Sequence, residues 1–177
     1  MAISPGATYS IVKPSFWHSR REIRNASNAL LGYYQHSGWM QSKAEGEAHG
    51  RKLIFSYKGW DNRSATMTDV SGNVLATFEA VGWVRTQYKL SYGGKEYTMK
   101  LNGWGTTFTI YEGETEVLSA TPGGYFKPGT ITVQSTIEEK DMLALVFFGL
   151  YEQYQIMAAA SAAGSAGVAG AVVVSSS

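Results

Sequence analysis

Cysteine is absent from the sequence, and its absence excludes several kinds of site. Without a thiol, the chain can form no disulfide framework, no thiolate nucleophile and no zinc site with cysteine ligands. Only 4 prolines accompany 20 glycines, a balance that fits a turn-rich β protein better than a low-complexity chain. The first residues also lack the charged and apolar regions of a secretory signal. Together these features favour a cytoplasmic location, with the protein either free there or peripheral at a membrane.

A strong net charge is also missing, since the formal net charge is +1 over 177 residues. This near neutrality disfavours nucleic acid as a partner. The charge is unevenly spread: residues 1–65 hold nine basic and four acidic side chains, and residues 66–177 hold six and ten. The richest basic cluster, which surrounds Glu22, consists of Lys13, Arg20, Arg21 and Arg24. This cluster either faces an anionic partner such as phospholipid headgroups or is an ordinary solvated surface.

Recognisable catalytic and metal-binding motifs are missing as well. His18, His36 and His49 are too far apart to show metal-ligand spacing, and we predict that they lie in loops or at the surface. The acidic residues of Glu112–Glu116 surround one predicted hairpin turn, where solvated carboxylates are expected rather than an acid–base pair. We therefore predict no catalytic, metal or cofactor site, although residues from distant loops can still assemble one.

Short alternating runs separated by turns fill the chain from about Tyr9 to Gln134. Gln87–Leu101 shows the pattern well, because apolar and polar residues alternate on both sides of a Gly-Gly turn. A further turn is predicted across residues 42–50. No helical period interrupts the runs, which disfavours a parallel sheet and indicates a sandwich or a barrel.

One unbroken apolar run, Met142–Tyr151, stands apart from this pattern. A capping box at Thr136–Glu139, or one residue earlier, predicts that a helix begins just before it. A helix that is apolar all round must be buried in protein or in lipid. A bilayer span needs about 20 apolar residues, and Glu152 interrupts this run after ten. We therefore predict no transmembrane span. A barrel wrapped around the helix is favoured over a helix packed on the outside of a sheet.

The last twenty residues have a different composition, made wholly of Ala, Gly, Ser and Val and without charge. Low-complexity composition of this kind is typical of a flexible tail, and small residues spaced four apart can also support a membrane or oligomer contact. We predict one domain over residues 8–157 and a flexible tail over residues 158–177.

Two segments resemble the tubby C-terminal-like superfamily, which includes the phospholipid scramblases and the LURP-one-related proteins. Thr68–Phe78 is similar to the D-x-x-G-N-x-Φ hairpins of the scramblase and LURP-one groups, where Φ is an apolar residue. Glu139–Tyr151 is similar to their terminal helix. The resemblance covers residues 8–157. It implies an all-β fold in which a closed antiparallel barrel of about twelve strands surrounds one buried, hydrophobic C-terminal helix. It also implies a membrane-linked or scaffold role rather than an enzyme.

The sequence thus favours a non-enzymatic barrel module that binds a membrane surface, a phospholipid headgroup or a protein partner. The candidate residues for contact with anionic lipid are Lys13, Trp17, Arg20, Arg21 and Arg24. Trp17 is included because an indole ring suits the depth of the headgroups while the neighbouring cations bind phosphate. The alternative is a lipocalin-like carrier of a small apolar ligand, which requires an open lumen and a helix outside the barrel.

Overall fold

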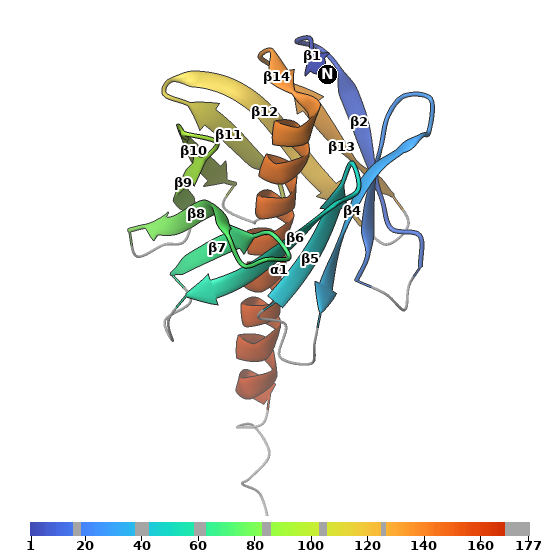
Figure 1. Cartoon of the computed structure of the whole chain (residues 1–177). Coiled ribbons are helices and arrows are strands. Elements are labelled where there is room, and N and C mark those ends of the chain that lie inside the picture. The colour runs from blue at the N-terminus through green and yellow to red at the C-terminus, as the bar shows by residue number, and fades with distance from the viewer. Residues whose placement is uncertain are drawn as a thin grey trace, which may run out of the picture.

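The chain folds into a closed β-barrel with one long helix along its axis (Figure 1). The computed structural model describes residues 1–15, 19–37, 43–58, 63–82, 86–102, 106–124 and 127–168, with the backbone alone for residues 37 and 159–168. Strands β2 to β13 pair in sequence order, every pair antiparallel, and β13 pairs back onto β2. This confirms the predicted all-β class and the closed barrel of about twelve strands around a hydrophobic helix.

The wall is an up-and-down meander of short strands, as the alternating runs predicted. Its strands are β2 (Thr8–Val12), β3 (Arg21–Arg24), β4 (Leu30–Ser37), β5 (Lys43–Ala48), β6 (Arg51–Lys58), β7 (Ser64–Thr68), β8 (Val74–Val81), β9 (Gln87–Tyr92), β10 (Lys95–Leu101), β11 (Phe108–Glu112), β12 (Thr115–Gly123) and β13 (Pro128–Val133). Closure gives each of these twelve strands two neighbours, so none of them is an edge strand.

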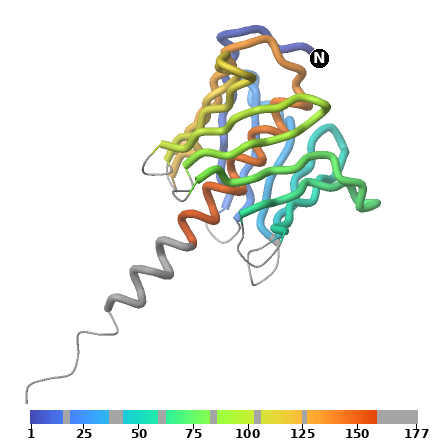
Figure 2. Tube along the Cα trace, turned by 90° about the vertical axis from the view of Figure 1, so that its left-hand side faces the viewer, coloured from blue at the N-terminus to red at the C-terminus, as the bar shows by residue number. Residues whose placement is uncertain are grey.

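The two ends of the barrel differ in how their strands are connected. At one end, which we call the cap end, tight turns join the strands, and β1 (Ala2–Ile3) pairs with β14 (Ile137–Glu138). Helix α1 (Glu139–Val168) begins there and emerges at the opposite end, the exit end (Figures 1 and 2). Contacts at both ends fix this direction. The β5–β6 turn residue His49 pairs with Glu139, and Tyr57 near the end of β6 donates to Glu152.

Helix α1 fills the lumen because its residues inside the barrel are apolar on every side. Met142 to Phe148, Leu150 and Tyr151 are all at most 3% exposed. Phe148 stacks on Phe78 with ring centroids 5.3 Å apart and meets Phe55 edge-on at 5.2 Å. Each such buried side chain contributes roughly 1.5–3 kcal/mol. The helix is therefore a large part of the core.

Glycines set the distance between helix and wall. On the wall, Gly46 of β5 faces the ring of Phe147, where an added Cβ would lie 2.8 Å from Cδ2. On the helix, Gly149 faces the ring of Phe108, and a Cβ there would overlap that ring. Small residues on one side thus make room for aromatic rings on the other, which lets the helix lie close to β5 and β11.

Two sequence predictions about local structure are wrong. Residues 43–48 form strand β5, not part of a turn, because the inward positions Ala44 and Gly46 are small where Phe147 fills the lumen. The helix also begins at Glu139 without the predicted capping box. The Ser135 hydroxyl donates to the Glu116 carbonyl at 2.7 Å, and the Glu139 amide donates to the Met1 carbonyl at 2.9 Å.

The predicted lipocalin-like alternative required an open lumen with the helix outside the barrel. The helix occupies the lumen, so that alternative is not supported. No helix within the described segments is both long enough and apolar enough to cross a bilayer.

Candidate functional site

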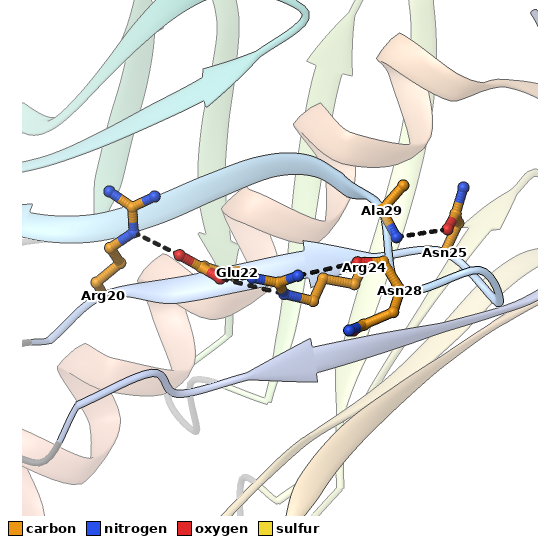
Figure 3. Close-up of polar contacts among 6 residues, drawn as sticks. All are labelled: Arg20, Glu22, Arg24, Asn25, Asn28 and Ala29. Carbon is orange, nitrogen blue, oxygen red and sulfur yellow. Dashed lines mark hydrogen bonds and ion pairs between the residues drawn. The ribbon is translucent and has the colours of Figure 1, made fainter.

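Strand β3 divides the predicted basic cluster. Arg20 and Arg24 lie with Glu22 on the outer face of the wall, whereas Ile23, on the opposite face, is fully buried. The Glu22 carboxylate accepts from Arg20 Nε at 3.0 Å and from Arg24 Nη2 at 2.7 Å (Figure 3). Glu22 is 7% exposed, so its carboxylate is largely shielded from water and lies between the two guanidinium groups. The three side chains together therefore carry a net charge of one, less than the cluster of basic residues suggests.

Arg24 belongs to the cap end and not to the rest of the cluster. Its Nη1 donates to the Asn28 carbonyl at 2.9 Å, inside the turn that joins β3 to β4 (Figure 3). The Asn25 side chain completes this turn by accepting from the Ala29 amide at 2.9 Å. With its donors committed to Glu22 and to this turn, Arg24 stabilises the hairpin, and we do not place it in the candidate site.

Arg20 contributes to a groove of about 450 Å³ on the outer wall. Its guanidinium carbon lies 3.9 Å from the centre of the Tyr33 ring, a cation–π contact. The Tyr33 hydroxyl donates to Glu47 at 3.1 Å, and burial raises the pKa of Tyr33, helped by that hydrogen bond. Since Glu47 also lines the groove, an anion bound there would meet a carboxylate. The groove is therefore a poor anion site.

Lys13, Arg20 and Arg21 all lie at the exit end, where β2 ends and β3 begins. The antiparallel wall brings more basic side chains to the same end from strands far apart in the sequence. These are Lys43, Lys58, Arg63, Lys100 and Lys127. We call these eight residues the exit rim. Glu22 is the one acidic side chain among the described residues within one position of the strand ends there.

The exit rim could be found only in part from the sequence. Its members are separated by up to about two thirds of the chain, so no local run of charge reveals them. One signal was available: alternate connections of an up-and-down meander meet at the same end, and basic residues recur beside these connections. Trp17 was also predicted to contact lipid. It lies outside the described residues, as do Trp39, Trp60, Trp83 and Trp104.

Just inside the exit rim, a polar network joins the helix to the wall. Glu152 is 2% exposed and accepts from the Tyr57 hydroxyl at 3.2 Å. The His36 ring stacks on Tyr154, with centroids 3.5 Å apart, and its Nε2 lies 3.0 Å from the Tyr34 hydroxyl. Burial raises the pKa of Tyr57 and of Tyr34 well above the ordinary value. These tyrosines therefore stay protonated and serve as hydrogen-bond groups at the mouth of the barrel.

The histidines show no arrangement for metal binding in the described segments, where no group of His, Asp and Glu is placed to hold an ion. The prediction that His36 lies in a loop or at the surface is wrong, because it belongs to β4 and to the network just described. His49 lies in the β5–β6 turn as predicted, about half exposed and 3.0 Å from Glu139. His18 falls outside the described residues.

Comparison with known proteins adds information on the fold alone. No protein-family model matches the chain, and no curated protein matches it. Among solved structures, a protein of Arabidopsis thaliana, AT5G01750, superposes with a TM-score of 0.55 at 12% sequence identity. The match covers 83% of this chain and 91% of the other. That neighbour is a closed barrel, which is consistent with the tubby-like fold that the sequence resembles.

Proposed function

We propose that this protein is a non-enzymatic barrel module that binds an anionic phospholipid membrane surface. The observation that carries this proposal is the exit rim, where the described residues within one position of the strand ends include eight basic side chains and one acidic side chain, Glu22. The helix fills the lumen, so a ligand has to be bound at the ends or on the outer wall of the barrel. A ring of cations at one end suits a flat, negatively charged partner better than a small ligand in a pocket.

The proposal includes a distant relationship to the tubby-like barrels, of the LURP-one-related or scramblase type. The closed barrel with its axial helix supports this relationship, as does the similarity to the Arabidopsis barrel. Kinship of this kind suggests a membrane-linked role without naming a ligand, so the choice of an anionic surface depends on the charges of this chain.

Electrostatics sets the expected strength of binding. A Lys or Arg close to an anionic leaflet contributes about 1 kcal/mol at physiological salt. Lys43, Lys58 and Lys127 are exposed, and no ion pair is found for them within the described segments. Neutralising all three should therefore weaken binding by about 3 kcal/mol, which is roughly a 100-fold increase in Kd.

Co-sedimentation with phosphatidylserine-containing vesicles tests the proposal. The rim variant Lys43→Gln, Lys58→Gln, Lys127→Gln is compared with a cap-end variant of equal charge, Lys52→Gln, Lys95→Gln, Lys140→Gln. We expect the wild-type chain and the cap-end variant to sediment with anionic vesicles at low salt, and the rim variant to remain in the supernatant. If the wild-type chain ignores anionic vesicles at low salt, the proposal is wrong.

A further inference from the structure

The helix leaves the barrel at the exit end and continues beyond it (Figure 1). Its last charged residue is Glu152, which is 2% exposed and hydrogen-bonded to Tyr57 inside the barrel. From Gln153 to the end of the chain no residue carries a charged side chain. The backbone is helical to Val168, which extends it about 24 Å past Glu152 at 1.5 Å per residue.

Met157 shows that the emerging helix has left the core. It is 58% exposed, whereas Tyr151, less than two turns earlier, is fully buried. An exposed methionine on an uncharged helix, surrounded at its base by cations, combines apolar surface with a positive collar. Buried apolar area and electrostatic attraction to anionic lipids are the two terms that strengthen binding at a membrane interface.

The cap end has the opposite electrostatic character. Among the described residues within one position of its strand ends, and in the first turn of α1, nine acidic side chains accompany five basic ones. Glu112, Glu114 and Glu116 lie there on one hairpin. An anionic surface would thus attract the exit end and repel the cap end. The negative end of the helix dipole, about half a charge, also points through the exit end, but the cations of the rim outweigh it.

From these observations we infer that the barrel docks end-on to an anionic bilayer. The exit rim lies on the headgroups, the axis of α1 is near the bilayer normal, and the uncharged extension of α1 enters the interface. The inference rests on the proposed function and adds the orientation and the inserted element. The extension could instead pack against a second copy of the chain, because its own residues are small and allow helices to approach closely. Such a contact would leave the positive charges of the exit rim without a negatively charged partner.

The absence of cysteine allows a direct test of the orientation. A single cysteine is introduced at Met157→Cys, or at Val70→Cys in the β7–β8 turn of the cap end, where Val70 is 68% exposed. Each variant is labelled with a polarity-sensitive fluorophore and mixed with phosphatidylserine-containing vesicles. We expect the emission to shift to shorter wavelength for the label at position 157 and to stay unchanged for the label at position 70.

A second pair of variants tests the same point without a label. Met157→Asp places a negative charge where the extension meets the leaflet, and Val70→Asp places the same charge at the cap end. We expect Met157→Asp to weaken vesicle binding roughly five- to tenfold and Val70→Asp to leave it unchanged.

The outcomes separate the inference from the function that it depends on. If the unmodified chain does not bind vesicles, the proposed function fails. If it binds but the label at position 157 shows no shift, or position 70 shifts as strongly, end-on docking is wrong. If the label at position 157 shifts without vesicles as protein concentration rises, the extension contacts a second copy and the inference is also wrong.

Discussion

At the scale of single residues, the fit between helix and wall depends on glycines that leave room for aromatic rings. Gly149 lies in the buried part of α1, and a methyl group there would overlap the Phe108 ring. Replacing a helical glycine by alanine normally gains about 1 kcal/mol of helix propensity. Overpacking a filled core costs about 1–3 kcal/mol and occasionally more. Since the clash involves a ring enclosed in a closed barrel, we expect the packing cost to exceed the gain.

Gly149→Ala should therefore lower the free energy of unfolding by about 1–2 kcal/mol, measured by urea denaturation. The same substitution in a Phe108→Leu background provides the control, because the smaller side chain makes room for the methyl group. In that background Gly149→Ala should be neutral or stabilising, which a double-mutant cycle reports as coupling between the two positions. Equal effects in both backgrounds would contradict the proposed contact.

Tyrosines give the molecule its expected pH dependence. Burial, together with Asp141, raises the pKa of Tyr92 to about 12 from an ordinary value of 10.0. Burial likewise raises the pKa of Tyr34, Tyr57 and Tyr151. Above pH 10 the unfolded chain therefore loses protons that the folded chain keeps, and this favours unfolding. The stability from these groups is complete below pH 10 and is lost as the pH rises through their folded pKa values.

We expect the urea midpoint to be constant from about pH 8 to pH 10 and to fall between pH 10 and 12. The tyrosinate absorbance of these four side chains should appear together with unfolding, not before it. Tyr92→Phe should make the decline shallower, because one titrating group is removed. A midpoint that is constant through pH 12 would show that the tyrosines ionise without cost in the folded state.

At the scale of elements, the helix shows what sequence could and could not predict. The unbroken apolar run predicted a buried helix. The alternating runs predicted strands that could form a wall around it. Strand β5 was missed because its inward residues, Ala44 and Gly46, are small and give no apolar alternation. Their size makes sense only once Phe147 is known to face them. The local sequence pattern thus predicts an element such as α1, which packs against many side chains. It does not predict a strand such as β5, whose small residues fit one particular side chain.

The two parts of α1 should respond oppositely to truncation of a side chain. Phe148 is fully buried between the rings of Phe55 and Phe78, and Met157 is 58% exposed on the emerging part. Phe148→Ala should cost about 3–5 kcal/mol of unfolding free energy because it leaves a cavity in the lumen. Met157→Ala should change stability by no more than about 0.5 kcal/mol. Comparable losses from both substitutions would mean that the helix is packed along its whole length.

At the scale of the whole molecule, the candidate site depends on topology. The sequence identified Lys13, Arg20 and Arg21 because they are near one another in the chain. The sequence could not identify Lys100 or Lys127, which reach the same end only because every strand of the meander reverses direction. It also placed Arg24 in the cluster, since the sequence does not show that β3 carries this residue to the opposite end. Charge asymmetry along the axis therefore becomes visible only when the barrel closes.

The same closure makes the wall dependent on the helix. Eight large apolar side chains of α1, from Met142 to Tyr151, are buried in the lumen. Their burial contributes roughly 12–24 kcal/mol in total, more than the net stability of about 5–15 kcal/mol typical of a domain. A chain of residues 1–138 would leave Phe55, Phe78 and Phe108 facing an empty interior. We expect it to lose its near-UV circular dichroism and to bind the dye ANS, as expanded states do.

A chain of residues 1–158 is the matched control, because it removes the extension and the tail but keeps every lumen-facing residue of α1. It also tests the predicted boundary between a domain over residues 8–157 and a tail. We expect it to unfold in one cooperative transition at the same temperature as the full chain, monitored by circular dichroism. If the chain of residues 1–138 kept a native spectrum, the wall would fold without the helix, and this prediction would be wrong. If 1–158 unfolded early, the extension would belong to the domain.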